Sequence, residues 1–194
     1  AGKSTLAYAL IAAMLRGDTF LGTPTQAIPV LLFSVEEHKR DVRRRLRRFG
    51  VPRDAQLYLQ ARPIPTSPLE WGALRAFIRA KGIKLIVLDT LARCWAAWGV
   101  ADENDNARVL AALTPLLELT RDLEVTVLGL HHTGKLAQSH GREVRGASAI
   151  LGLADQCLLL DRHRTGDRYD RVLQTLGRYE ESPGELVIRF DPAH

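Results

Sequence analysis

Three short, almost unbroken runs of apolar residues constrain the fold of this chain most strongly. The runs cover residues 30–35, 84–89 and 125–131, and the segments of helical periodicity around them cover residues 38–49, 69–81 and 105–122. Strands with one solvated face alternate apolar and polar residues, whereas continuous apolar strands separated by helices are typical of a parallel sheet buried on both faces. The sequence therefore predicts an α/β fold with a mostly parallel sheet flanked by helices on both faces.

The last fifty residues have a different pattern. A short helix after Gly146 leads to a strand over 157–161, and the segments 169–176 and 185–190 then alternate apolar and polar residues. The residues between these two segments include Glu-Glu-Ser-Pro-Gly, which is typical of a turn. We therefore expect a C-terminal antiparallel hairpin that ends the sheet, within one domain over residues 1–194.

Composition narrows the class of protein. No apolar run approaches the roughly 18–20 residues that a membrane-spanning helix needs. The two cysteines, Cys94 and Cys157, form neither a metal motif nor a disulfide framework and suit a reducing cytoplasm. The net charge of +5 is compatible with a polyanionic partner, and an arginine-rich composition that reflects a high-GC genome explains it equally well.

The chain begins Ala1-Gly2-Lys3-Ser4-Thr5, followed by an Ala/Leu-rich segment that predicts a helix. These residues match the second half of the phosphate-binding motif G-x-x-x-x-G-K-[ST], so we expect the rest of the motif and its strand to precede them. In such a loop, backbone N–H groups at the helix start surround the phosphates, the lysine reaches the β and γ oxygens, and the hydroxyl binds Mg²⁺. Gly2, Lys3, Ser4 and Thr5 are therefore predicted to bind nucleotide, with Ser4 as a metal ligand.

Asp89 ends the apolar run 84–89. Open α/β sheets bind their ligands beyond the carboxyl ends of their strands, so this carboxylate is predicted to share the Mg²⁺ site with Ser4. The alternative is an Asp that only caps the following turn.

Glu36 and Glu37 follow the run 30–35 in the same way. A carboxylate at this strand end is suited to polarise the water that attacks a nucleoside triphosphate. We choose Glu36 as the base, with Glu37 as the substitute. The alternative is that both are solvated acids in the first turn of the next helix, where its dipole favours them.

His131 and His132 end the third apolar run. Adjacent residues at a strand end point in opposite directions, so at most one of the two faces the nucleotide. No further His or Cys lies at zinc-binding spacing, which disfavours a metal site and favours a polar sensor of the γ-phosphate.

Two segments are rich in basic residues. The polar stretch 134–146 carries Lys135, Arg142 and Arg145 and is suited to contact nucleic-acid phosphates, although an ordinary solvated loop explains it equally well. The predicted helix 38–49 buries one apolar stripe and covers its other side with arginines, which favours a solvated or subunit-facing surface over a DNA-binding one.

Taken in order, these segments resemble the RecA-like P-loop ATPase core of RepA-type hexameric helicases, with the DnaB, KaiC and RadA ATPases as wider relatives within the AAA ATPases. The segments that carry the resemblance are GKSTLA, FSVEE, RRRLRRFG, LIVLDTLARC, LGLHHTGK, RGASAI, ADQCLLL and LGRYEESPGELVIRFD. They extend over essentially the whole chain.

The resemblance implies roles for single residues. Glu36 matches the catalytic glutamate, His132 the sensor that links the γ-phosphate to the DNA-binding loop, and 134–145 that loop. Arg178 matches the arginine that reaches a neighbouring subunit's nucleotide, although the lysine of the K-x-R signature is absent here. RepA itself has an arginine near the position of Asp155.

The resemblance thus implies an ATP hydrolase that uses ATP and Mg²⁺, forms a homo-oligomeric ring such as a hexamer, and acts on single-stranded DNA as a replicative helicase or related motor. The alternative is a RecA-fold regulatory or recombination-mediator ATPase that binds a protein partner without unwinding. A small-molecule kinase is disfavoured because nothing in the sequence resembles a lid or an acceptor pocket.

Overall fold

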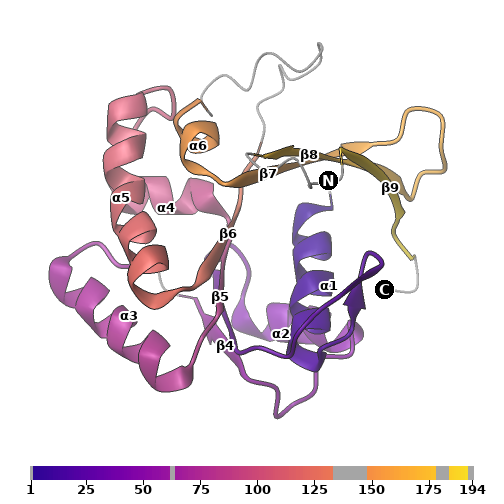
Figure 1. The fold of residues 1–194 in the computed structure, drawn as a ribbon, viewed down its shortest axis with the longest axis horizontal. Coiled ribbons are helices and arrows are strands. Elements are labelled where there is room, and N and C mark those ends of the chain that lie inside the picture. Colours follow the sequence, from indigo (N-terminus) through magenta and orange to yellow (C-terminus); the bar gives the residue numbers. More distant parts are fainter. Residues whose placement is uncertain (1, 62–63, 133–147, 178–183, 192–194) are drawn as a thin grey trace.

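The structure is a computed structural model that describes residues 2–61, 64–132, 148–177 and 184–191 (Figure 1). The elements are α1 (Lys3–Arg16), β1 (Thr19–Phe20), β2 (Thr23–Pro24), β3 (Val30–Ser34), α2 (Lys39–Arg48), β4 (Leu57–Gln60), α3 (Pro68–Lys81), β5 (Leu85–Asp89), α4 (Leu91–Ala97), α5 (Asn106–Leu123), β6 (Thr126–Leu130), α6 (Ser148–Leu153), β7 (Gln156–Arg162), β8 (Asp170–Gly177) and β9 (Glu185–Arg189). Within these described ranges, no helix is long and apolar enough to cross a membrane.

A four-stranded parallel sheet with the order β4-β3-β5-β6 forms the centre of the fold. Ser34 at the end of β3 lies opposite Asp89 at the end of β5, and Asp89 lies opposite Leu130 at the end of β6. The predicted parallel sheet is thus confirmed, and the three apolar runs of the sequence are neighbouring strands in it. Their carboxyl ends meet at one edge, which is where the candidate site lies.

Two separate apolar clusters cover the two faces of this sheet. Leu31 and Phe33 of β3 pack into a cluster with residues of α3, α4 and α5, whereas Val30 and Leu32 pack on the other face with α1 and α2. In Figure 1 the sheet accordingly runs between α3 and α5 on one side and α1 and α2 on the other. Every residue of β3 and β5 is buried, which explains why these strands are continuously apolar.

A separate antiparallel sheet with the order β7-β8-β9 contains the C-terminal hairpin. The predicted pairing of β8 with β9 is confirmed, but the expectation that this hairpin ends the parallel sheet is wrong. β8 instead has β7 as its second neighbour, paired antiparallel from Gln156 opposite Gly177 to Arg162 opposite Arg171, so the hairpin belongs to a three-stranded sheet of its own. In the described residues the two sheets do not share a hydrogen-bonded strand pair.

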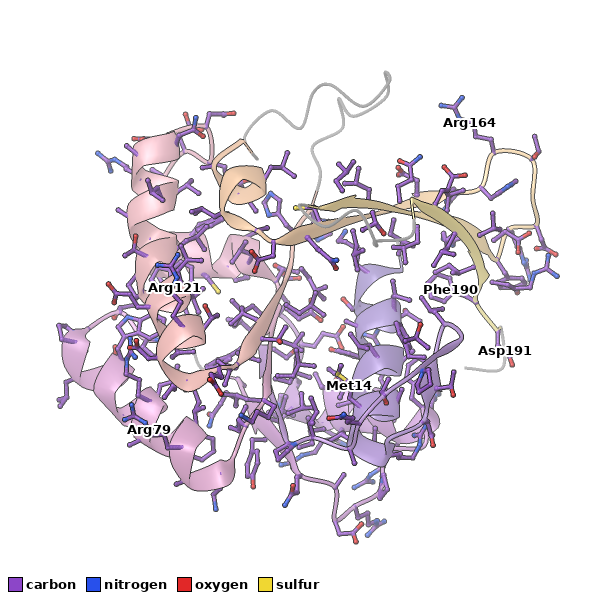
Figure 2. The ribbon with its side chains drawn as sticks, in the orientation of Figure 1. Met14, Arg79, Arg121, Arg164, Phe190 and Asp191 are labelled. Carbon is purple, nitrogen blue, oxygen red and sulfur yellow. The ribbon has the colours of Figure 1, made fainter. Side chains whose placement is uncertain are left out.

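The antiparallel sheet reaches the beginning of α1 at Gly2. The backbone φ of Gly2 is 111°, and a Cβ atom at this position would lie 2.8 Å from Cε2 of Phe190, directly after β9. Figure 2 labels Phe190 on this side of the molecule. Only glycine tolerates both the backbone conformation and the close ring, so this position is fixed by the fold as well as by the motif.

Candidate nucleotide-binding site

The amino end of α1 provides a place for an anion. Gly2 is the N-cap residue and supplies no side-chain oxygen, and among the described residues no side chain caps the first turn. The backbone N–H groups of that turn therefore lack the partners that a capping Ser or Asp would give them. Lys3 and Ser4 begin the helix at this point, so unpaired N–H groups, an ammonium group and a hydroxyl lie together as a phosphate site requires.

Asp89 is the centre of the buried part of the site. Its side chain accepts hydrogen bonds from Ser4 Oγ at 3.2 Å and from the Tyr8 hydroxyl at 3.3 Å, and the residue is only 6% exposed. Burial raises the pKa of Asp89, and the hydrogen bonds from Ser4 and Tyr8 oppose that rise. The predicted proximity of Ser4 and Asp89 is thus present, and a buried carboxylate with few donors around it is suited to a cation.

Tyr8 is a member of this site that the sequence analysis missed. It lies four residues after Ser4, so both side chains leave the same side of α1, and that spacing was the available signal. The residue is fully buried, and the guanidinium of Arg45 lies 4.6 Å from the centre of its ring. Burial, followed by the negative charge of Asp89, raises the pKa of Tyr8, so its hydroxyl remains a donor at neutral pH.

We expect Tyr8→Phe to lower the free energy of unfolding by about 1–3 kcal/mol, because it removes one of the donors to a buried carboxylate. The pKa of Asp89 rises further in this variant for the same reason. Urea denaturation at neutral pH measures the effect. Tyr58→Phe is the matched control, since no hydrogen bond of the Tyr58 hydroxyl is found in the described residues and its ring packs edge-on against Phe77. Equal losses in the two variants would contradict the assignment.

Glu36 and Glu37 have different partners. Glu36 accepts hydrogen bonds from Thr90 Oγ1 at 2.9 Å and from Arg93 Nε at 3.2 Å, so it lies beside the residue that follows Asp89. Glu37 instead forms an ion pair with Arg45 of α2. Thr90 and Arg93 were not identified from the sequence. Glu36 is therefore held at the carboxyl edge of the sheet, whereas Glu37 connects that edge to α2.

The adjacent histidines point to different partners, as their position at a strand end predicts. His132 Nδ1 lies 3.1 Å from the ammonium nitrogen of Lys3, and His131 Nε2 lies 3.2 Å from a carboxylate oxygen of Glu103. Burial lowers the pKa of His131, although Glu103 opposes this shift. Only His132 is directed toward the lysine of the phosphate-binding motif.

Residues 1–138 of the 194 match a protein-family model described as an AAA domain. The chain belongs to this family. The match extends from the Lys3–Ser4 helix start through β6 and both histidines, so it includes every site residue described above. A search of curated proteins finds no match to this chain.

Membership of the AAA family makes this chain a nucleotide-binding domain of the ATPase type, and its residues fit the cation that such domains use with nucleotide. Ser4 and Asp89 offer two oxygen ligands side by side at the first turn of α1. Mg²⁺ prefers oxygen ligands, and in nucleotide sites it takes one or two from protein and the others from water and phosphate. In the described part of the AAA domain there is no group of three or more His, Cys, Asp or Glu residues that could hold a metal ion by itself.

Four predicted site residues lie outside the described residues: Arg178, Lys135, Arg142 and Arg145. Their roles stay predictions. Thr5 is the third residue of α1 and contributes a backbone N–H group to its first turn. Asp89, Glu36, Lys3, Ser4 and His132 are the predicted residues that the fold brings together at one edge of the sheet.

Proposed function

We propose that this chain is an ATP-hydrolysing motor domain that acts on single-stranded DNA, as RepA-type replicative helicases and related DNA-handling ATPases do. One observation carries the proposal of hydrolysis. Ser4 Oγ lies 3.2 Å from Asp89 Oδ1 although 85 residues separate them, so the phosphate-binding helix start meets an acidic strand end. The proposal of DNA as partner rests on the resemblance of the motifs and on the net positive charge.

In this proposal the first turn of α1 and Lys3 bind the phosphates of ATP. Ser4 and Asp89 hold Mg²⁺, which supplies positive charge to the phosphate oxygens when it is bound.

Glu36 accepts a proton from the attacking water, and Thr90 and Arg93 keep its carboxylate in position. His132 senses the terminal phosphate, because it contacts the same lysine that binds that phosphate.

The proposed assembly is a homo-oligomeric ring, such as a hexamer, in the cytoplasm. Arg178 of one subunit would stabilise negative charge on the phosphoryl group bound to its neighbour. The stretch with Lys135, Arg142 and Arg145 would contact the DNA phosphates.

ATP turnover by the full-length protein, with and without single-stranded DNA, tests this proposal. We expect turnover to increase when DNA is added, and we expect Lys3→Ala to abolish turnover under both conditions, because its ammonium group binds the β and γ oxygens. ATP turnover that does not change when DNA is added would instead favour a regulatory or recombination-mediator ATPase. Turnover that persists in Lys3→Ala would contradict the nucleotide site itself.

A further inference from the structure

The outer face of α2 carries six exposed basic residues, and Asp41 at its edge pairs with one of them. The six are Lys39, Arg40, Arg43, Arg44, Arg47 and Arg48. At about 100° per residue they occupy roughly half of the helix circumference, in two rows with a spacing of four residues. Val42 and Leu46 on the opposite face are buried against the core.

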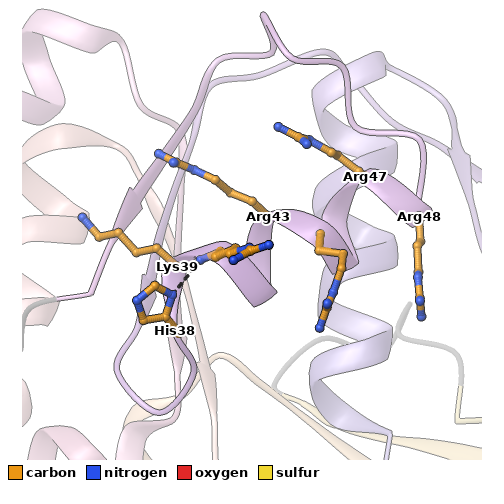
Figure 3. A pocket seen from close by; sticks show the side chains of 7 residues that line it. His38, Lys39, Arg43, Arg47 and Arg48 are labelled. Atoms are coloured by element: carbon orange, nitrogen blue, oxygen red, sulfur yellow. Dashed lines mark hydrogen bonds between the residues drawn. The ribbon is translucent and has the colours of Figure 1, made fainter.

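A hollow of about 670 Å³ lies over this face, lined by these six side chains and His38 (Figure 3). Figure 3 shows Lys39, Arg43 and Arg47 extending toward one side of the helix and Arg48 toward the other. The rows thus diverge and present their charged ends to solvent over a broad surface.

Most of this charge has no counter-charge within the described parts of the chain. Arg44 pairs with Asp41 at 2.8 Å, whereas the other five have no acidic partner among the described residues. Like charges four residues apart destabilise a helix, and Lys39 and Arg40 also oppose the positive end of its dipole. The face therefore lowers the stability of the folded chain, which indicates that its charge meets an anion outside the chain.

The positive charge of the whole chain is concentrated here. α2 contains seven basic residues and one acidic residue, a net charge of +6, whereas the complete chain has +5. The seventh basic residue, Arg45, lies on the inner side of α2 and pairs with Glu37. An approaching polyanion is consequently attracted to α2 more than to the rest of the molecule.

We infer that the outer face of α2 binds the sugar-phosphate backbone of a nucleic acid. Five of its six cations are arginines, whose planar guanidinium groups pair with phosphate oxygens through two N–H groups. The face has no apolar or aromatic residue to form the core of a protein interface or to stack on bases. Binding is therefore electrostatic and independent of sequence. It does not require ATP hydrolysis.

Binding of a fluorescent oligothymidylate to the full-length protein, without nucleotide and from about 50 to 200 mM salt, tests this inference. In the variant Lys39→Ala/Arg43→Ala/Arg47→Ala we expect the plot of log K against log salt to be less steep by about 2, since each lost phosphate contact contributes about 0.7 for a single strand. Affinity at the low-salt end should fall by roughly tenfold or more.

Arg79→Ala/Lys84→Ala/Arg121→Ala is the matched control, because it removes three exposed cations from α3, the turn before β5 and α5. Figure 2 labels Arg79 and Arg121 on the side of the molecule away from α1. The control should keep the wild-type salt slope. Arg43→Lys/Arg47→Lys keeps the charge and should keep the slope as well. The urea midpoint of the α2 triple variant should equal or exceed that of the wild type, because the substitutions remove repulsion.

Wild-type affinity and slope in the α2 triple variant would overturn the inference. Poly-glutamate that displaces the oligonucleotide as well as unlabelled DNA does at equal charge would also overturn it, in favour of an acidic protein partner. Lys3→Ala should bind the oligonucleotide like the wild type, so failure of the proposed ATPase function and failure of this surface give different results.

Discussion

Replacing Glu36 by Gln is expected to lower ATP turnover by about 10²–10⁴-fold, the usual contribution of a general base. The amide has nearly the same shape and still accepts the hydrogen bond that Thr90 donates to the carboxylate. It cannot accept a proton from water, however. Nucleotide affinity should stay close to that of the wild type, because the described hydrogen bonds of Glu36 come from Thr90 and Arg93, and none comes from Lys3 or Ser4. Steady-state turnover and calorimetric binding of a non-hydrolysable ATP analogue measure the two effects.

Glu37→Gln is the control that decides between the two carboxylates. This variant weakens the ion pair with Arg45, so it should affect stability slightly and turnover much less than Glu36→Gln does. Wild-type turnover in Glu36→Gln together with a large loss in Glu37→Gln would move the role of the base to Glu37.

Asp89→Asn should have opposite effects on activity and on stability. Turnover should fall at least a hundredfold, since charge stabilisation by a properly held metal ion is worth several kcal/mol and each factor of ten costs about 1.4 kcal/mol. The urea midpoint of the nucleotide-free protein at neutral pH should rise. Burial makes the ionised carboxylate unfavourable in the folded chain, and the amide removes that charge while it can still pair with the hydroxyls of Ser4 and Tyr8.

The raised pKa of Asp89 also predicts how the stability difference between the wild type and Asp89→Asn changes with pH. The pKa of Asp89 is raised in the folded protein, so between its ordinary value and the raised value the folded chain holds a proton that the unfolded chain has released. The stability of the wild type therefore falls as the pH rises through this interval, and that of Asp89→Asn does not. The difference between the two midpoints should grow from acidic to neutral pH. Asp54→Asn, at an exposed position, should show no such trend. A variant less stable than the wild type at neutral pH would contradict this account.

The sequence was sufficient to predict the parallel sheet and its helices because the burial of each element determines its pattern of apolar and polar residues. β3 and β5 are continuously apolar, and α2 combines a buried stripe at Val42 and Leu46 with a mostly basic outer face. Those patterns depend only on local burial. The motif residues Lys3, Ser4 and Asp89 were predictable for a related reason, since a helix start and a strand end are recognisable in sequence.

Short elements without a periodic pattern, and the choice of neighbour for some strands, were not predictable. The seven residues of α4 contain one tryptophan, with a second at the C-cap, and show no helical periodicity, so Arg93 had no predicted position beside Glu36. The β1–β2 hairpin is formed by two residues on each side of Leu21 and Gly22, both with positive φ. The alternation in β8 and β9 indicates strands but carries no information that β7 is the other neighbour of β8.

The close approach of Phe190 to Gly2 has a consequence for how the protein is made. The two residues are separated by nearly the whole chain, and ribosomes add about 5–20 residues per second. The start of α1 is thus translated roughly 10–40 s before the aromatic ring that will pack on it. During synthesis the phosphate-binding turn therefore lacks its contact with the Phe190 ring. Contacts between such distant parts of a chain form slowly, because closing a long loop costs conformational entropy. The nucleotide site is therefore expected to reach its final structure only after β9 has left the ribosome.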